Sequence, residues 1–577
     1  MELAVPPSLL EAAAGPGLGA QVSAALAEAG PGPAYPALAD VAPAKVLLFR
    51  SLLEAPGKEG AERLNQGTLY LASALRGAGV AVVLSDAKVS RFARDPQERR
   101  TLGRLLEEHP DLGLVAIGLY DAYFEEAAVL VDFLRARLRA RLAVGALMPT
   151  RDPEAALVHL PGVDLVGRGA GEDLLPRLAL LAAACPPGPL DDAALGGLLA
   201  LDGVLAADGG DAVVWAGAET VLRAPDLDSC TLDFSFMERR DAESGPALCL
   251  SRGCASACHF CTSPDQGRFQ GKSALEVGRV LSAYGRRLKE LYGSWSAVPA
   301  AAFGIGFYDD DFLADGARAK AVLEVVRRSP FHLRFLQASI RACFRRGPGG
   351  RLVGLDEGLL DALSPELFLP KLGRGALSED PQLYLGTESF CDAELARLGK
   401  GYGAAEVETA VRALSGRGLR QAHHFIAANA RTRPEDVLES LARIARLREE
   451  CGPAFGLLEP VIPHLVSFPG TASLRALQRE ALDGQVERRG LLAIAGFPEF
   501  DYPLTERDVP ADGDVAAWVE RLARKGPGVD WGAELEGLLF EWLLTSERLS
   551  ARGVEPERAA RLRRAVDAQA RFAQAAA

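Results

Sequence analysis

The sequence has few cysteines and lacks any long apolar segment. Nine cysteines in 577 residues are too few for a scaffold built on disulfides, and three of them lie between residues 254 and 261. In a reducing compartment such crowding suggests metal ligation. No uncharged apolar run approaches the roughly 18 residues that span a bilayer, and the best candidate, 178–185, stops at two prolines. We therefore expect no membrane-spanning segment and no membrane partner.

An excess of basic residues is also absent. The 64 lysines and arginines are outnumbered by 77 aspartates and glutamates, which gives a net charge of -13. A protein that grips nucleic-acid backbone usually has the opposite balance, so we expect a small molecule or a peptide as partner and no nucleic acid. Glu2 and Pro6 stand where a secretory signal would have a basic start and an apolar stretch. A cytoplasmic location is expected, and the oligomeric state stays open.

The first half of the chain predicts a doubly wound, Rossmann-like parallel sheet. Residues 1–42 form a lead segment rich in Ala, Pro and Gly. Short apolar runs then alternate with segments of helical composition over 43–185, a rhythm typical of a parallel sheet wrapped by helices. The predicted strands lie near 46–49, 80–84, 112–119, 142–147 and 163–166, and two of the predicted helices span 64–75 and 125–139.

The second half predicts a partial (β/α)6 barrel. Residues 186–244 have the composition of a connector, with a small hairpin near Val213 and Val214. Six βα units follow over 245–470, and in barrels of this kind the chemistry sits at the carboxyl ends of the strands. Residues 471–577 are predicted to form a mainly helical region. The barrel strands are expected near 247–250, 301–307, 333–340, 383–388, 421–427 and 455–460, with helices over 274–291, 316–328, 404–414 and 434–450.

The strongest chemical signal is a loop with the spacing Cys-x3-Cys-x2-Cys, formed by Cys254, Cys258 and Cys261. Three thiolates on one tight loop can hold three corners of a [4Fe-4S] cluster, for which four cysteines are the usual complement. The fourth iron is then open to a substrate or cofactor. The alternative is a zinc site that uses Cys258, Cys261 and a remote pair, but the spacing differs from that of the common zinc modules.

At these residues the chain resembles the radical S-adenosylmethionine (SAM) superfamily, whose hallmark is Cys-x3-Cys-x-aromatic-Cys, with Phe260 as the aromatic. The resemblance implies that the open iron chelates the amino and carboxylate groups of SAM. One electron from the cluster would then split SAM to a 5′-deoxyadenosyl radical. It also implies an electron donor such as flavodoxin or ferredoxin.

The resemblance continues along the predicted barrel. Asp310, within the run 307–312, stands where the family has an Asp-Asp-x-Phe segment, although a run of aspartates taken alone is more often a solvated turn. Glu388 is the acid of a Gly-x-Glu-Ser motif, 386–389, that closes the fourth predicted strand, and its carboxylate would accept hydrogen bonds from the SAM ribose. Residues 399–401 follow as in many members. Gln337, on the third predicted barrel strand, is a further candidate contact of the cofactor.

The amino-terminal domain resembles the cobalamin-binding domain that is fused to many radical SAM enzymes. Small residues at its loops would let a large macrocycle approach the backbone. The implied contacts are Gly118, Leu119, Gly145, Ala146, Gly169, Gly171 and Glu172.

Two features depart from the cobalamin-binding pattern. No histidine precedes His109, so the family's axial ligand to cobalt is missing, and Ala146 replaces a glycine. Either cobalt is bound without a protein imidazole, or the domain is a Rossmann unit that has lost cobalamin.

Two other reactive residue types are interpreted as structural. Strand alternation sends His423 and His424 to opposite faces, so at most one faces the barrel interior, and a packed histidine is the favoured interpretation. Cys391 could quench a radical, but a single cysteine is more often a small buried hydrophobe.

Together these patterns predict a cobalamin-dependent radical SAM methyltransferase that methylates an unactivated carbon of a small metabolite or peptide. Alternatives with the same cofactors are cyclisation, ring contraction or another oxidative rearrangement, and a polar cobalamin-mediated methylation. An iron-sulfur protein that only transfers electrons is a different class of alternative. The sequence does not indicate the substrate.

Overall fold

The computed structural model describes most of the chain between residues 42 and 473. The described residues are 42–50, 64–120, 124–151, 153, 156, 160–184, 204–207, 213–216, 226–263, 265–371, 382–428, 434–457, 462–464 and 471–473. The predicted lead segment before residue 42 and the predicted helical region after residue 473 lie outside them. The chain divides into two compact units, 1–55 with 60–238 and 56–59 with 239–577, and each is described by itself.

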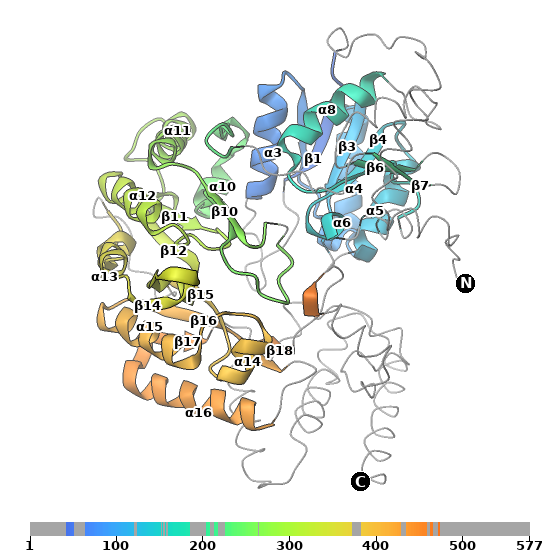
Figure 1. Ribbon diagram of the computed structural model, residues 1–577. Coiled ribbons are helices and arrows are strands. Elements are labelled where there is room, and N and C mark those ends of the chain that lie inside the picture. The colour runs from blue at the N-terminus through green and yellow to red at the C-terminus, as the bar shows by residue number, and fades with distance from the viewer. Residues whose placement is uncertain are drawn as a thin grey trace, which may run out of the picture. The chain divides into compact units, whose positions relative to one another are not determined.

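The first unit contains the predicted doubly wound parallel sheet (Figure 1). Its strand order is β2-β1-β3-β4-β5, so the order reverses between β1 and β3, where ligands of such sheets usually bind. The antiparallel strands β6 and β7 form the hairpin predicted near Val213, and they also extend the sheet beyond β5, which the sequence analysis did not predict. The strand bounds are β1 Lys45–Phe49, β2 Val82–Ser85, β3 Leu112–Gly118, β4 Arg141–Gly145, β5 Leu165–Gly167, β6 Val204–Ala207 and β7 Val213–Ala216.

Helices cover both faces of this sheet. Their bounds are α3 Gln66–Gly77, α4 Pro96–Glu108, α5 Phe124–Arg135, α6 Leu147–Arg151 and α8 Gly171–Ala184. α3 begins after Asn65, whose side chain accepts from the backbone nitrogen of Gly67 at 2.8 Å. On one face, buried leucines such as Leu102 and Leu130 of α4 and α5 pack in one core cluster with Val115 and other strand residues. α3 and α8 lie side by side (Figure 1).

The second unit is built on six parallel strands that neighbour one another in chain order, β8-β11-β12-β15-β16-β17. This is the arrangement of the predicted partial (β/α)6 barrel, so the predicted fold class is confirmed. The strands are β8 Ala247–Leu248, β11 Gly304–Phe307, β12 His332–Ser339, β15 Leu383–Glu388, β16 Gln421–Ala428 and β17 Phe455–Leu457, and β18 Ile462–His464 pairs with the end of β16.

The connecting helices of the second unit match the predicted spans closely. They are α11 Ala274–Tyr292, α12 Gly316–Arg328, α13 Glu357–Ala362, α14 Asp392–Arg397, α15 Ala404–Gly416 and α16 Pro434–Cys451, and a short helix, α10 Arg239–Glu243, precedes β8. Ser273 and Asp315 cap α11 and α12 with their side-chain oxygens, which fixes where these helices begin. No helix in the described part of the chain combines the length and the apolar character that a membrane span requires.

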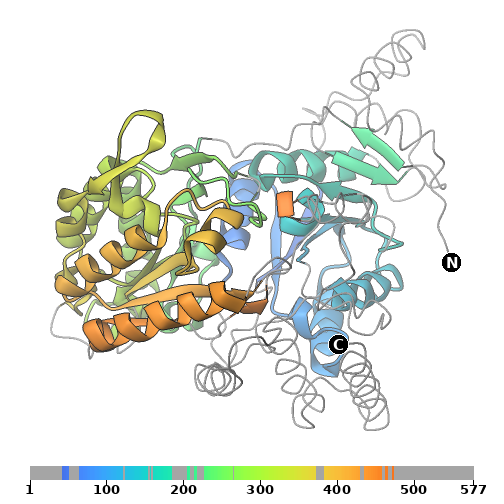
Figure 2. The same cartoon turned by 60° about the horizontal axis from the view of Figure 1, so that its bottom comes forward.

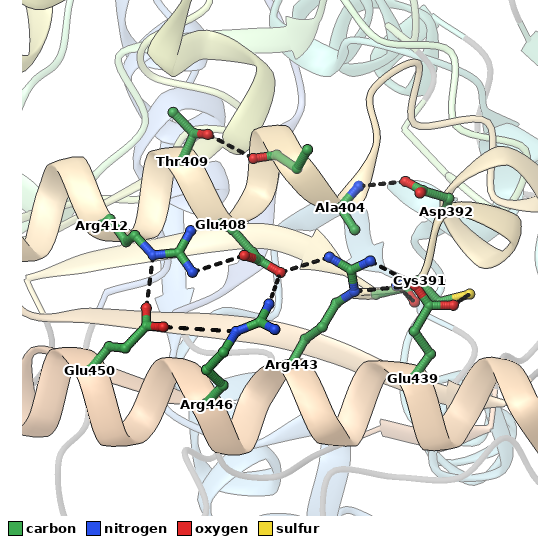
Figure 3. A network of polar contacts seen from close by, with 12 residues as sticks. Cys391, Asp392, Ala404, Glu408, Thr409, Arg412, Glu439, Arg443, Arg446 and Glu450 are labelled. Carbon is green, nitrogen blue, oxygen red and sulfur yellow. Dashed lines mark hydrogen bonds and ion pairs between the residues drawn. The ribbon is translucent and has the colours of Figure 1, made fainter.

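Ion pairs join α15 to α16. Glu408 of α15 accepts hydrogen bonds from Arg412 at 2.9 Å and from Arg443 at 2.7 Å, and Arg446 pairs with the same carboxylate. The two helices lie side by side in Figure 2, and Figure 3 shows the three arginines converging on Glu408. Glu408 is 7% exposed, whereas the three arginines are 26–50% exposed, so the network joins a buried carboxylate of α15 to partly exposed guanidinium groups.

Candidate functional site

The predicted cluster loop leaves the barrel on a small hairpin. The first barrel strand ends at Leu248, two residues earlier than predicted, and β9 (Ser251–Cys254) pairs antiparallel with β10 (Arg268–Gly271). Gly253 has φ of 72°, and a Cβ there would lie 2.1 Å from the carbonyl oxygen of Arg268. Glycine is therefore required immediately before Cys254. Cys258 and Cys261 follow in the loop, where the Cys261 nitrogen donates to the Cys258 carbonyl at 3.2 Å.

The environment of the three thiols fits a cluster-binding loop. The backbone nitrogens of Ser256 and Ser263 each approach a sulfur to 3.3 Å, that of Cys254 and that of Cys261 respectively. Such amide contacts are among those that stabilise cluster thiolates. Burial raises the pKa of each thiol, to about 11 for Cys261, and the neighbouring thiol of Cys258 raises the pKa of both others further. A bound metal centre would keep such buried thiols deprotonated.

The part of the chain that the structure describes offers no site for a single metal ion. Within the described residues, no three His, Cys, Asp or Glu side chains are grouped so that they could hold one ion.

The aspartates that follow β11 hold the cluster loop in place. Asp310 is exposed, and its Oδ2 accepts from the Gly253 nitrogen at 2.8 Å and from the Ser263 hydroxyl at 3.3 Å. Asp309 is fully buried and accepts from the Ser251 hydroxyl at 2.5 Å. The predicted alternative of a solvated turn is therefore wrong for this run, because two of its three side chains are buried.

The third aspartate of the run reaches the first cysteine. Asp311 is 1% exposed and accepts from the Ser339 hydroxyl at 2.6 Å, and the Cys254 sulfur lies 3.8 Å from its Oδ2. Burial raises the pKa of both buried acids, to about 7 for Asp309. From the sequence only Asp310 was predicted to act at the site, although the position of the whole run at a strand end pointed to all three aspartates.

Glu388 forms an ion pair with Lys400 at the end of β15. The Lys400 Nζ lies 3.4 Å from Glu388 Oε1, and the two side chains are 6% and 12% exposed. The same ammonium lies 5.8 Å from the ring centre of Phe260, between the second and third cysteines. Burial alone would lower the pKa of Lys400, but Tyr402, Glu388 and Cys258 together raise it. Lys400 is thus a buried charged residue at the site, a role that was not predicted from the sequence.

The backbone at Glu388 is unusual. Its φ is 66°, and among the described residues other than glycine only Ala146 shares a positive φ. Residues held in this region cluster at functional sites, because the surrounding structure must offset the strain. Gln337, the other predicted contact, is half-buried on β12, where it pairs in register with Tyr384 of β15.

The segment at the end of α14 also holds the cluster loop, through His259. The backbone nitrogen of His259 donates to the Leu398 carbonyl at 2.9 Å, and its ring Nδ1 donates to the Arg397 carbonyl at 2.8 Å. Gly399 has φ of 70°, and a Cβ there would come within 2.8 Å of the His259 ring. The cluster loop is therefore held by segments that follow two different barrel strands, β11 and β15.

The predicted cobalamin contacts gather at one edge of the first unit's sheet. Gly118 and Gly145 end the neighbouring strands β3 and β4, and Leu119 is buried beside them with its nitrogen bonded to the Gly145 carbonyl. Ala146 follows with φ of 83°, a conformation that normally requires glycine. Thr150 of α6 donates to the Ala146 carbonyl and, at 2.9 Å, accepts from the Gly169 nitrogen after β5.

The last two predicted contacts begin α8. Gly171 is needed for packing, because a Cβ there would lie 2.7 Å from the Leu71 side chain of α3. Glu172 is buried at 6% exposure. Thus the seven residues lie at the carboxyl edge of β3, β4 and β5. At least at Gly171, the packing against α3 by itself explains why the residue is glycine.

Comparisons with known proteins agree with this architecture. Residues 61–179 match the family model of the B12-binding domain. The cobalamin-dependent S-adenosylmethionine radical enzyme OxsB, solved with aqua-cobalamin and SAM bound, is similar over 91% of this chain and 75% of its own, with a TM-score of 0.57 and 16% identity. The radical SAM methyltransferase TsrM from Kitasatospora setae, solved with cobalamin and a [4Fe-4S] cluster, is similar over 70% of each chain, with a TM-score of 0.50 and 16% identity. No curated protein sequence matches the chain.

The chain has the fold of the cobalamin-dependent radical SAM enzymes. The resemblance drawn from Cys254, Cys258 and Cys261 and from the amino-terminal loops is confirmed at the level of fold. At this level of identity, the similarity concerns the fold and leaves the roles of individual residues to the local geometry.

Within this radical SAM fold, the two residues interpreted as structural are packed. His423 is fully buried, and its ring nitrogens lie 2.6 Å from the Thr387 hydroxyl and 3.0 Å from Gln421 Oε1. Burial lowers its pKa to about 3, so the ring is neutral. Cys391 is 1% exposed, and its sulfur contacts Glu439 at 3.5 Å (Figure 3). The packed environment expected for His423 and Cys391 is therefore present.

Proposed function

We propose that this protein is a cobalamin-dependent radical SAM methyltransferase that methylates an unactivated carbon of a small metabolite or peptide. The observation that carries the proposal is that the buried ion pair of Glu388 and Lys400 lies beside Phe260 of the cysteine loop. The other unit of the same chain matches the B12-binding domain. Such a site combines thiolates for an iron-sulfur cluster with a carboxylate suited to a nucleoside. The proposal includes a cytoplasmic location and an external electron donor of the flavodoxin or ferredoxin type.

In this proposal the residues of the second unit have distinct roles. Cys254, Cys258 and Cys261 hold a [4Fe-4S] cluster, which when bound supplies the electron for the reductive cleavage of SAM. Glu388 accepts hydrogen bonds from the ribose hydroxyls, and Phe260 and Gln337 lie beside the nucleoside. Asp310 keeps the cluster loop against the barrel through Gly253.

In the first unit, the edge formed by β3, β4 and β5 would hold cobalamin, which when bound supplies the methyl group. The glycines at 118, 145 and 169 leave room for a ligand close to the backbone. No histidine precedes His109, so we propose that the chain would hold a bound cobalamin without an imidazole from the segment before residue 109. Electron paramagnetic resonance of the cob(II)alamin form tests this point, since splitting from a protein imidazole nitrogen would contradict it. Failure to retain cobalamin would favour a structural Rossmann unit.

Anaerobic reconstitution tests the cluster. We expect about four iron atoms per chain and, with dithionite and SAM, formation of 5′-deoxyadenosine. Cys258→Ala should abolish both, whereas Cys451→Ala, which changes a cysteine in the last turn of α16, should leave both intact. Four iron atoms retained when Cys254, Cys258 and Cys261 are all changed to alanine would refute the proposal.

Product counting separates methylation from its alternatives. Methylating an unactivated carbon by this route uses SAM twice, once to methylate cobalamin and once to make the radical. With a substrate, S-adenosylhomocysteine and 5′-deoxyadenosine should therefore each equal the methylated product. Cyclisation or ring contraction would give 5′-deoxyadenosine without matching S-adenosylhomocysteine, and S-adenosylhomocysteine alone would indicate polar methylation.

A further inference from the structure

The charges around the three cysteines are unevenly distributed. The Lys400 ammonium lies 5.8 Å from the ring centre of Phe260, two residues after Cys258. The positive charges of Lys400 and Arg341 and the negative charge of Glu388 act on the Cys258 thiol. Asp311 Oδ2 lies 3.8 Å from the Cys254 sulfur, and Asp310 accepts a hydrogen bond from the hydroxyl of Ser263, two residues after Cys261. One corner of the cluster loop is therefore flanked by positive charge and the other two by acids.

Lys400 is the more deeply enclosed of the two cations. Its side chain is 6% exposed, whereas Arg341 is half-buried. The Lys400 ammonium is bonded to Glu388 and lies above the rings of Phe260 and Tyr402, at 5.8 and 5.9 Å. A charge enclosed in this way is weakly screened by solvent, so it acts strongly on its neighbours.

We propose that Lys400 is a positioning residue that raises the reduction potential of the cluster and that Glu388 partly cancels this effect. The inference rests on the proposed function, because it requires a cluster on Cys258. Reduction adds one electron to the cluster, and a nearby positive charge stabilises the more negative, reduced form. A paired anion opposes that stabilisation, so the two residues of one ion pair act on the potential with opposite signs.

The test is a redox titration of the reconstituted full chain, with dithionite as the reductant and no SAM, followed by electron paramagnetic resonance. Lys400→Met should make the midpoint potential more negative by at least a tenfold change in the reduction equilibrium, which is about 59 mV for one electron. Lys400→Arg keeps the positive charge, so its midpoint potential should stay close to that of the wild type. Glu388→Gln should shift the potential in the positive direction.

Lys371 supplies the matched control. Its ammonium donates to the carbonyls of Val326, Arg327 and Ser329 at 2.7 to 3.0 Å, at the end of α12 and before the start of β12. It therefore lies near the amino ends of the strands, whereas the cluster loop is held from their carboxyl ends. Lys371→Met removes the same charge from the same unit and should leave the potential unchanged.

Each outcome decides the inference. A potential in Lys400→Met equal to that of Lys371→Met overturns it. If Lys400→Met assembles no cluster, Glu388→Gln decides alone: a positive shift supports the inference, and no shift overturns it. A wild-type chain without a cluster overturns both this inference and the proposed function, whereas an intact cluster with unshifted variants overturns the inference only.

Discussion

The backbone nitrogen of Gly253 donates a hydrogen bond of 2.8 Å to the Asp310 carboxylate, across 57 positions of sequence. This bond ties the residue before Cys254 to the segment that follows the neighbouring strand β11. Because Gly253 has a positive φ that favours glycine, the position of the first cysteine depends on a turn that requires glycine and on the acid that holds it.

Removing this acid should loosen the cluster loop. A hydrogen bond to a charged group typically contributes about 1.5–3 kcal/mol, so Asp310→Ala should release iron to a chelator at least about tenfold faster. Asp310→Asn keeps a hydrogen-bond acceptor, so its rate of iron release should lie between those of the wild type and Asp310→Ala. The measurement is the decay of cluster absorbance, with Asp361→Ala as an exposed control. Equal decay rates in Asp310→Ala and the wild type would show that the bond does not support the cluster.

Glu388 should contribute to the affinity for SAM. Loss of a charge-assisted hydrogen bond costs about 1.5–3 kcal/mol, so Glu388→Gln should weaken SAM binding by roughly ten- to a hundredfold. The iron content should remain that of the wild type. Equilibrium binding to the reconstituted protein measures the effect, with the exposed Glu366→Gln as control. An unchanged affinity would move the ribose contact to another acid, and Asp310 is the next candidate.

Ala146 should be more stable as glycine. The left-handed conformation costs an L-residue about 1–2 kcal/mol, while a new glycine costs about 0.4–1 kcal/mol through the unfolded chain. Ala146→Gly should therefore stabilise the first unit by about 0 to 1.6 kcal/mol. Ala143→Gly, in the extended strand β4 of the same sheet, should destabilise it. Hydrogen exchange of the β3 and β4 amides compares the stability of the two variants. Equal destabilisation by Ala146→Gly and Ala143→Gly would rule out strain at Ala146.

Glu408 should make the contact of α15 with α16 sensitive to acid. Burial alone would raise its pKa, but the bonds from Arg443 and Arg412 and the charge of Arg446 lower it below its ordinary value of 4.5. A lowered pKa gives stability that is present above about pH 4.5 and is lost as the pH falls through the lower, folded-state pKa.

The corresponding variant is Glu408→Gln. At pH 7 it should reduce the free energy of local opening of α15 and α16 by about 1–3 kcal/mol. The difference from the wild type should shrink as the pH falls below 4.5. Hydrogen exchange at several pH values measures this, and Glu449→Gln on the exposed face of α16 is the control. A difference that persists unchanged in acid would contradict the role of the ionised carboxylate.

The sequence by itself determined the fold class, most element positions and the cysteine loop. Alternation of apolar runs with helical segments is a local property, so it predicted α12 at its observed bounds and β15 to the residue. The spacing of Cys254, Cys258 and Cys261 is likewise local, because one loop carries all three.

Only the tertiary structure decided what surrounds these residues. The pairing of Gly253 with Asp310, the burial of Asp309 and Asp311, and the position of Lys400 beside Phe260 join segments that follow different strands. Nothing in the local pattern specifies such contacts, because they depend on strand order and on which side chains each strand end brings together. The positive φ of Glu388 and of Ala146 belongs to the same class. An L-residue adopts that conformation only when the packed surroundings offset its strain.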